Sequence, residues 1–244
     1  MNKLIGKLED ILTNSTNFIA FTGAGLSTES GIPTYRGVGG LWMKYDPNKY
    51  ANFHYFLKNP SYYWNFFREV RYPVIKQARP NAAHYALVKM EREGKLNHVI
   101  TQNIDGLHQK AGQLNVIELH GNTREIVCMD CSEIFSIEDV YKLLDREFPP
   151  KCSNCRGILR PNTVLFGESL PQKLLNEAMH LAQNCDLFFV LGSSLVVSPA
   201  AQIPKIAKDR GAALVIINLD KTPLDDIADL VIHDKVSNVL SKII

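Results

Sequence analysis

Hydrophobic residues near the N-terminus recur at helical spacing. Leu4, Ile5, Leu8, Ile11 and Leu12 predict an amphipathic helix from about Lys3 to Asn14. Further along, short apolar runs alternate with helical patterns. The runs predicted to be strands are 18–21, 97–101, 116–119, 186–191, 213–217 and 230–232, and the predicted helices are 61–77, 81–94, 171–183, 200–210 and the C-terminal segment. This alternation predicts an α/β fold with a parallel sheet and helices on both faces.

The stretch from Gly37 to Pro60 breaks the regular pattern. It is rich in Gly, Pro, Asn and aromatic residues, which favours a long loop with short helical pieces. A loop of that length inside a compact domain usually forms a lid or a binding loop.

Composition narrows the class of protein. The chain has 244 residues, 45% of them hydrophobic and 21% charged, with a net charge of +2. These values are ordinary for a globular protein, and nucleic-acid binding is not directly indicated. No apolar run reaches ~18 residues, so no membrane span is expected. The N-terminus does not resemble a signal peptide, and we expect a cytoplasmic protein.

The first predicted strand leads into a glycine-rich turn, Thr22-Gly23-Ala24-Gly25. A strand followed by small residues and a helix is typical of dinucleotide binding, because backbone N–H groups can approach a phosphate there. This turn departs from the usual pattern: Thr28 stands at the third glycine, and no acid follows about 20 residues later to hold a ribose. The segment containing Tyr35 and Arg36 follows instead.

Polar residues follow two other predicted strands. Gln102-Asn103-Ile104-Asp105 comes after one, and His120 comes after the next. Ligands of open α/β sheets bind at the carboxyl ends of strands, so these residues are candidates for a binding site. Asn103 and Asp105 also suit a simple turn.

Two C-x-x-C pairs lie 20 residues apart. They are Cys128, Cys131, Cys152 and Cys155. This spacing is typical of a zinc site, and four thiolates leave no open coordination position, so the predicted zinc ion is structural. Four buried or oxidised cysteines are the alternative. Cys185 stands alone and is interpreted as a small core residue.

The motifs G-A-G-L-S-T, T-Q-N-I-D-G-L-H, E-L-H-G, P-N-T-V-L-F-G-E and G-S-S-L-V-V, together with the cysteine pairs, closely resemble the sirtuins. The resemblance spans nearly the whole chain and looks like a short prokaryotic-type catalytic core. It implies a Rossmann-like sheet with a small inserted zinc-ribbon module. It also implies an NAD-dependent protein lysine deacylase, which transfers the acyl group to ADP-ribose and releases nicotinamide.

The resemblance assigns site residues by position. It makes His120, Asn103 and Asp105 catalytic, with His120 as the general base; His108 is the competing histidine. The residues it places at NAD are Gly23, Ala24, Gly25, Thr28, Tyr35, Arg36, Gln102, Asn103, Ile104, Asp105, His120, Gly192, Ser193, Ser194, Asn218, Leu219, Asp220 and Val236.

The substrate implied by the resemblance is an acylated lysine in an extended peptide that pairs with exposed backbone. The residues placed there are Val164, Phe166, Gly167, Glu168, Leu195 and Val196. Relatives that prefer acidic acyl chains carry a Tyr-x-x-Arg, where this chain has Phe67 and Val70. A neutral acyl group is therefore expected.

The predicted domain division follows from these assignments. Residues 1–36, 78–124 and 161–244 would form the NAD-binding domain, residues 125–160 the zinc module, and residues 37–77 a cofactor loop and helical segment of the small domain. We expect a monomer. Two alternatives remain: a mono-ADP-ribosyltransferase that uses the same NAD contacts, and a binding module that senses NAD without needing His120.

Overall fold

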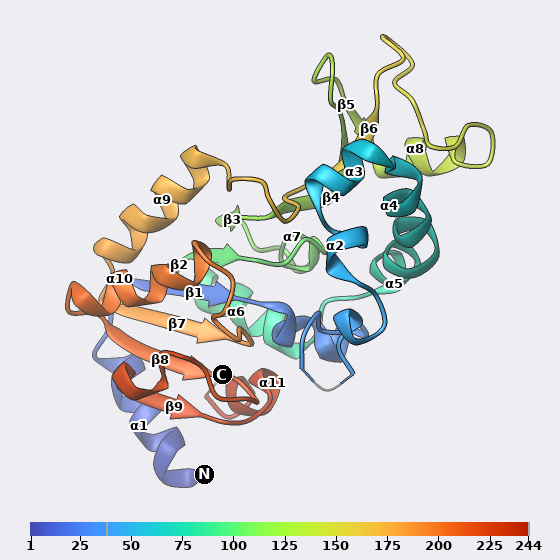
Figure 1. Cartoon of the computed structure of the whole chain (residues 1–244). Coiled ribbons are helices and arrows are strands. Elements are labelled where there is room, and N and C mark those ends of the chain that lie inside the picture. The colour runs from blue at the N-terminus through green and yellow to red at the C-terminus, as the bar shows by residue number, and fades with distance from the viewer. Residues whose placement is uncertain (38, 244) are drawn as a thin grey trace.

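The computed structural model describes residues 1–37 and 39–243 and contains a six-stranded sheet of order β3-β2-β1-β7-β8-β9. All neighbouring strands in it are parallel. The strands are β1 (Phe18–Thr22), β2 (Leu96–Thr101), β3 (Val116–Glu118), β7 (Leu187–Leu191), β8 (Ala213–Ile217) and β9 (Leu230–Ile232). The predicted parallel α/β fold is confirmed (Figure 1).

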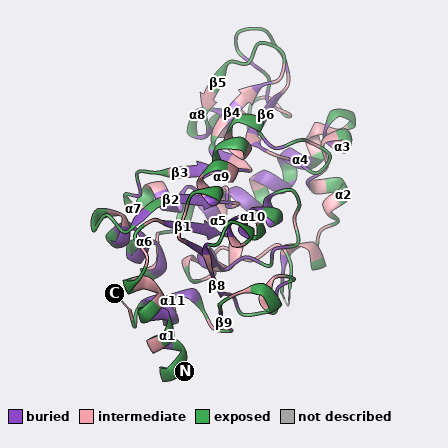
Figure 2. Ribbon diagram, turned by 90° about the vertical axis from the view of Figure 1, so that its left-hand side faces the viewer, coloured by how far each residue is buried: buried purple, intermediate pink, exposed green. Residues whose placement is uncertain are grey.

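Both faces of the sheet are covered. In β1, Phe18 and Ala20 belong to one hydrophobic cluster, whereas Ile19 and Phe21 belong to another, because successive side chains of a strand point to opposite faces. All five residues of β1 are buried, and Figure 2 shows this strand in purple in the interior. A strand buried on both faces reads as a continuous apolar run, which explains the Phe-Ile-Ala-Phe pattern.

Amphipathic helices supply the two covering layers. Helices α1 (Asn2–Thr13), α6 (Ala82–Arg92) and α11 (Val236–Leu240) pack on the face of Phe18. Helices α9 (Gln172–Gln183) and α10 (Ile203–Asp209) pack on the face of Ile19. Asn81 caps α6, accepting hydrogen bonds from the backbone N–H groups of Ala83 and His84. A short helix, α7 (Leu107–Ala111), follows β2.

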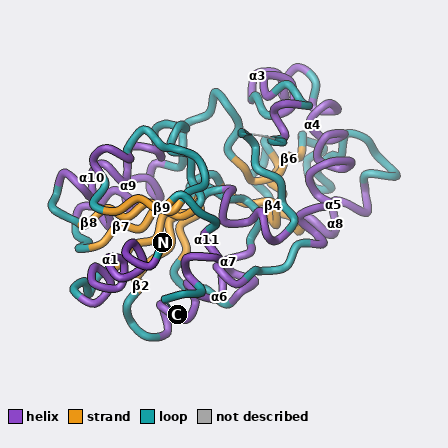
Figure 3. Tube along the Cα trace, turned by 90° about the horizontal axis from the view of Figure 1, so that it is seen from below, coloured by secondary structure: helices purple, strands orange, loops and turns teal. Residues whose placement is uncertain are grey.

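A second, antiparallel sheet has the order β5-β4-β6. Its strands are β4 (Gly121–Cys128), β5 (Ile134–Ser136) and β6 (Leu159–Thr163), and α8 (Ile137–Leu143) follows β5. Figure 3 shows β4 and β6 apart from the large sheet, beside α4, α5 and α8. A separate hydrophobic cluster joins this sheet to the aromatic helices: it contains Trp64 and Phe67 as well as Cys128 and Leu159.

Residues 37–60 contain short helical pieces, as the sequence predicted, and the predicted helix over 61–77 is divided into three parts. The segment contains η2 (Leu41–Met43), α2 (Pro47–Tyr50), α3 (Phe53–Lys58), α4 (Pro60–Phe66), a π-helix (Phe67–Arg71) and α5 (Tyr72–Gln77). Side chains of Asp46 and Asn52 cap α2 and α3. These helices are too short to produce a readable hydrophobic period, so packing of their aromatic residues stabilises them.

Among the described residues, none of the helices has both the length and the apolar character needed to cross a membrane.

Candidate active site

The order of the large sheet changes direction between β1 and β7, and a ligand crevice is expected at the carboxyl ends of the strands there. Gly25 and Gly192 meet at this point, where the Gly25 N–H donates to the Gly192 carbonyl at 2.8 Å. Gly192 has φ +64°, and a Cβ on it would lie 2.3 Å from the Leu26 nitrogen. Glycine is thus required for two loops to touch.

This contact changes the expected role of the first glycines. The N–H groups of Gly23 and Gly25 donate to Leu191 and Gly192 carbonyls, so neither is free for a phosphate. A 3₁₀ helix, η1 (Ala24–Ser30), follows in place of an α-helix. The departure at Thr28 fits this geometry, since its hydroxyl donates to the Gly25 carbonyl at 3.0 Å.

A cavity of about 820 Å³ opens above the crevice, which is ample for a dinucleotide and part of a peptide. The predicted site residues on its wall are Gly23, Ala24, Gly25, Thr28, Tyr35, Arg36, Gln102, Asn103, Ile104, His120, Val164, Phe166, Gly167, Glu168, Gly192, Ser193, Ser194, Asn218, Leu219, Asp220 and Val236. Asp105 lines a small adjoining pocket that shares Ala24, Tyr35, Asn103 and Ile104. Residues 38 and 244 lie outside the described chain.

Two predicted substrate residues are not brought to this cavity. Leu195 is buried at 4% exposure, and Val196 points outward at 52%. Neither lines the wall, whereas Val197 does. The positive φ of Leu195, +53°, turns the chain after β7, and sequence alone carried no signal for that turn.

Asn103 is held with its amide in one orientation. Its nitrogen Nδ2 donates to the Gly23 carbonyl at 3.0 Å and to the Ser27 hydroxyl at 3.2 Å. Its backbone N–H donates to the Thr101 hydroxyl. Among the hydrogen bonds of the described residues, none is to the amide oxygen, so it is left to accept one from a ligand.

Asp105 is buried at the end of the same loop, with 8% exposure. Its carboxylate accepts from the Ser27 hydroxyl at 2.8 Å and from the Leu107 N–H at 2.9 Å. Burial raises the pKa of Asp105, and these two hydrogen bonds oppose that shift. Ser27, which the sequence analysis did not single out, therefore positions both Asn103 and Asp105. Its place in G-A-G-L-S was the available signal.

His120 lies in the turn between β3 and β4 and on the cavity wall. Burial lowers the pKa of His120 below its ordinary value of 6.5, and a hydrogen bond with the Gln102 backbone opposes the shift. The imidazole is consequently neutral at pH 7, the form that accepts a proton.

The competing histidine, His108, lies elsewhere. It is 2% exposed, and its Nε2 lies 2.9 Å from the Thr22 hydroxyl. Its ring packs against His84 at 5.0 Å between centroids. His108 is therefore a core histidine that does not line the cavity.

The far half of the cavity is built by β7 and β8. The Gln102 amide donates to the Ser193 hydroxyl at 2.8 Å, which ties the loop after β2 to the loop after β7. Asn218 donates from its side chain to the Asp220 carbonyl at 2.8 Å, while Leu219 is exposed. The cavity is also lined by Trp42, Arg71 and Lys235, which the sequence analysis did not identify. No pattern in a single sequence indicates which loop residues face a cavity.

The segment Val164–Glu168 forms a loop with one bridge, between Asn52 and Phe166. Phe166 already uses both backbone groups: its N–H donates to the Ala51 carbonyl and its carbonyl accepts from Phe53. The Glu168 carboxylate is paired with Arg160, at 2.7 Å. The side chain of Glu168 is thus part of the loop's own structure.

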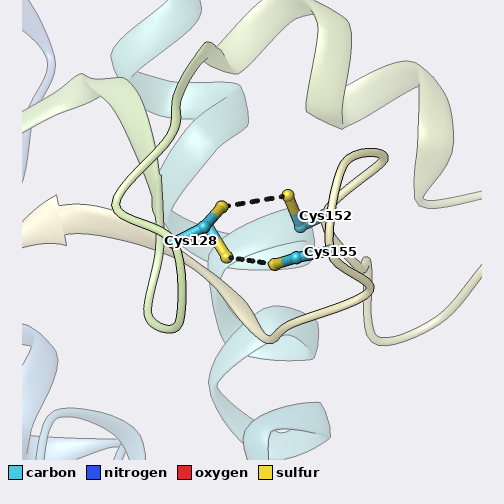
Figure 4. A group of neighbouring side chains, drawn as sticks. Cys128, Cys152 and Cys155 are labelled. Atoms are coloured by element: carbon cyan, nitrogen blue, oxygen red, sulfur yellow. Dashed lines mark hydrogen bonds between the residues drawn. The ribbon is translucent and has the colours of Figure 1, made fainter.

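The four paired cysteines converge. Their sulfur atoms all lie within 4.8 Å of one another, with Cys128 and Cys155 3.4 Å apart and Cys131 and Cys152 3.7 Å apart. Figure 4 shows Cys128, Cys152 and Cys155 pointing toward one another. Sulfur atoms on a tetrahedral zinc ion, at about 2.3 Å from it, are roughly 3.8 Å apart, so these four fit one structural zinc ion. Cys185 is separate and packs beside the core, as expected.

The parallel sheet, with its cavity at the reversal of strand order, places the chain among dinucleotide-binding α/β proteins. Within that class it belongs to the Sir2 family, whose family model matches residues 23–199. The expected membership of the sirtuins is thereby confirmed.

Relatives match over nearly their whole length. The NAD-dependent protein deacetylase of Sulfurisphaera tokodaii is 48% identical over 235 residues, covering 96% of this chain and 92% of its own. The NAD-dependent protein deacylase 2 of Archaeoglobus fulgidus is 46% identical and covers 100% and 96%. A solved structure described as Sir2 with a p53 peptide and NAD+ is 44% identical, with a TM-score of 0.92 and coverage of 98% and 96%.

Proposed function

We propose that this protein is an NAD-dependent protein lysine deacylase, with the residues of the cavity in the roles that the sequence assigned them. The observation that carries the proposal is the position of the half-buried His120, whose pKa is lowered by burial, on the same wall as the oriented amide of Asn103. When bound, NAD supplies ADP-ribose as the acyl acceptor and nicotinamide as the leaving group.

The catalytic roles follow from the hydrogen-bonding capacity of each group. His120 takes a proton from a ribose hydroxyl, because it is unprotonated at neutral pH and lies beside the cavity. Asn103 accepts a hydrogen bond through its free amide oxygen, and Asp105 with Ser27 fixes the loop beneath it. Tyr35 and Arg36 line the same cavity and would cover the nicotinamide.

The remaining cofactor contacts lie on the far side. Ser193 and Ser194 follow β7 and line the cavity, where they would hold the phosphates; Asn218, Leu219 and Asp220 follow β8 and would hold the adenosine. An Asn and an Asp after β8 replace the acid that a standard dinucleotide fingerprint carries after its second strand.

The acyl-lysine enters between Val164, Phe166 and Gly167 and the loop after β7. An extended peptide pairs there with backbone at Gly167 and with the N–H of Val197, whose carbonyl already accepts from the Ala201 N–H. Leu195 and Glu168 support these loops from behind: Leu195 is buried, and Glu168 accepts the Leu165 N–H at 2.8 Å while paired with Arg160.

The proposal also includes three expectations from the sequence: the domain division, a monomeric state and a cytoplasmic location. Residues 37–77 pack in one hydrophobic cluster with residues 125–160, which supports their assignment to one small domain. A monomer on acylated protein substrates, and a reducing cytoplasm that keeps the cysteines free for zinc, complete it. Light scattering of the purified protein measures its oligomeric state, and a dimer at micromolar concentration would contradict the expected monomer.

The test of the proposal measures nicotinamide release from NAD with an acetyl-lysine peptide. Release is expected only with the peptide, together with loss of the acetyl group. His120→Ala is expected to lower the rate roughly 10²- to 10⁴-fold, the usual contribution of a general base. NAD binding by calorimetry is expected to persist in this variant.

The same assay separates the alternatives. Nicotinamide release without acylated peptide, accompanied by a mass gain of ADP-ribose on protein, favours ADP-ribosyl transfer. Unchanged turnover in His120→Ala contradicts the proposed base. His180→Gln is the matched control, since this histidine is exposed on α9 and does not line the cavity.

A further inference from the structure

The loop that carries Asn103 and Asp105 is held by β4, a strand of the small sheet. The N–H and the side-chain hydroxyl of Thr123 both donate to the Ile104 carbonyl, at 3.1 and 2.8 Å. Thr123 is 2% exposed, so this pair of hydrogen bonds lies away from water. A backbone carbonyl oxygen has two lone pairs, and Thr123 occupies both of them.

The neighbours of Thr123 in β4 are themselves fixed. Asn122 is buried, and its side-chain oxygen accepts from the Arg124 N–H at 3.0 Å. The Arg124 guanidinium forms a bidentate ion pair with Glu118, at 2.9 and 2.7 Å. It also lies against the end of the loop, because a Cβ on Gly106 would be 2.6 Å from its Nη1. The backbone is therefore held on both sides of Thr123.

The peptide group between Ile104 and Asp105 is consequently held in one orientation. This group is planar and trans, so its carbonyl oxygen and its N–H point in opposite directions. With the carbonyl facing Thr123, the Asp105 N–H faces the other way, and among the hydrogen bonds of the described residues none comes from it. Ile104 and Asp105 both line the small pocket that adjoins the cavity. One backbone donor is thus left for a ligand at this pocket.

The proposed function brings nicotinamide, which carries a primary amide, to this end of the cavity. A primary amide has one carbonyl acceptor and two N–H donors. The Asp105 N–H donates and the Asp105 carboxylate accepts, so one residue offers both partners. Both partners depend on the orientation of the peptide group before Asp105, and that orientation depends on Thr123.

We propose that Thr123 is a positioning residue for the nicotinamide end of NAD: its hydroxyl fixes the Ile104 carbonyl and thereby aims the Asp105 N–H at the carboxamide. Thr123 does not line the cavity, so it acts through the peptide group and touches neither NAD nor the acyl-lysine. This inference rests on the proposed deacylase function. Its effect is confined to the nicotinamide, so the ADP-ribose part of NAD binds independently of Thr123.

The experiment compares the calorimetric Kd values of NAD and ADP-ribose. ADP-ribose carries a hydroxyl in place of nicotinamide, so the ratio of the two Kd values isolates the nicotinamide end. Thr123→Val keeps the branched shape and removes the hydroxyl. It is expected to weaken NAD roughly three- to tenfold, the loss of one neutral hydrogen bond, and to leave ADP-ribose binding at the wild-type level. Thr123→Ser keeps the hydroxyl and is expected to restore the wild-type ratio.

A second buried threonine supplies the matched control. Thr222 is 8% exposed, its hydroxyl donates to the Asp225 carboxylate, and it does not line the cavity, so Thr222→Val is expected to keep the wild-type ratio. In the deacylation assay, Thr123→Val is expected to raise the KM for NAD and the inhibition constant of the nicotinamide product, with the KM for the acetyl peptide unchanged. If Thr123→Val does not fold, Thr123→Ala, which lacks the same hydroxyl, supplies the comparison with Thr123→Ser.

The outcomes separate the two proposals. Equal weakening of NAD and ADP-ribose in Thr123→Val shows a structural role alone and overturns the inference, and so does an unchanged affinity for NAD. Deacylation of the acetyl peptide by the wild type in either case leaves the deacylase function standing. Absence of deacylation together with the expected change in the Kd ratio overturns the deacylase function and supports the role of Thr123 in binding NAD.

Discussion

His84 illustrates how burial alone sets the chemistry of a side chain. It is fully buried at the start of α6, and its Nε2 has no hydrogen-bond partner in the described chain. Burial lowers the pKa of His84 to about 4. The neutral ring serves the helix cap, where it lies 3.0 Å from the side-chain oxygen of Asn81. The same effect on His120 leaves that residue ready to act as a base.

The depressed pKa of His84 predicts acid sensitivity of the fold. Above pH 6.5 neither state binds the proton, so His84 leaves stability unchanged. Between pH 6.5 and about 4, His84 is protonated in the unfolded chain but not in the folded chain. The free energy of unfolding therefore decreases as the pH is lowered through this range. At pH 5 the loss from this one group is about 2 kcal/mol, at about 1.4 kcal/mol per unit of pH.

The measurement is denaturant unfolding at pH 7 and pH 5 of the wild type and of His84→Gln. The variant is expected to show a fall in stability smaller by about 2 kcal/mol, because glutamine does not titrate. His180→Gln, at an exposed site, is expected to keep the wild-type fall. An equal fall in all three proteins would contradict the assignment to His84.

At the scale of elements, the strands that carry the four paired cysteines also position the candidate active site. β4 begins one residue after His120, and β6 ends one residue before the substrate loop. The Val164 N–H donates to the His120 carbonyl, so the base and the substrate loop are joined through the ends of these two strands. A metal that holds Cys128 at the end of β4 against Cys152 therefore stabilises the segment that carries both.

Metal removal is accordingly expected to inactivate the protein. The purified protein is expected to carry one zinc ion per chain, by elemental analysis. Chelation is expected to abolish deacylation and to expose the buried Trp64, because structural zinc in small modules contributes on the order of 10 kcal/mol. Cys128→Ser is expected to lose the ion, whereas Cys185→Ser keeps it. Full activity without zinc would contradict a structural role.

At the scale of the molecule, the loops that follow the two central strands of the large sheet are in contact at two glycines. β1 and β7 are adjacent, yet they are far apart in sequence, and their following loops touch at Gly25 and Gly192. This contact forms the floor of the cavity. Binding of the dinucleotide consequently depends on the distance between two loops that the chain brings together only when the sheet is complete.

Gly192→Ala is expected to disrupt this floor. Its Cβ would approach the Leu26 nitrogen to 2.3 Å at a φ of +64°, so we expect a loss of at least about 2 kcal/mol and loss of NAD binding. Gly211→Ala is the control: it has a φ of +95° but open space around it, so it costs about 1 kcal/mol and keeps NAD binding. Calorimetric NAD titration and thermal unfolding measure both. Wild-type NAD affinity in Gly192→Ala would contradict the role of the contact.

The sequence by itself determined the features that depend on local pattern. The period of apolar residues predicted the strands and the long helices, because burial of one face or two leaves a readable repeat. The spacing of the cysteine pairs predicted their convergence, since each tight turn presents two sulfur atoms to one point.

Only the tertiary structure decided which side chains face the cavity and what partners they lack. Leu195 turns away at a positive φ, Glu168 is taken by Arg160, and the glycine N–H groups are used between loops. Trp42 and Arg71 both pack against the ring of Tyr35, and Arg71 is the last residue of a π-helix. These outcomes depend on contacts between distant segments, and a side chain's free hydrogen-bonding capacity exists only once all of its neighbours are in place.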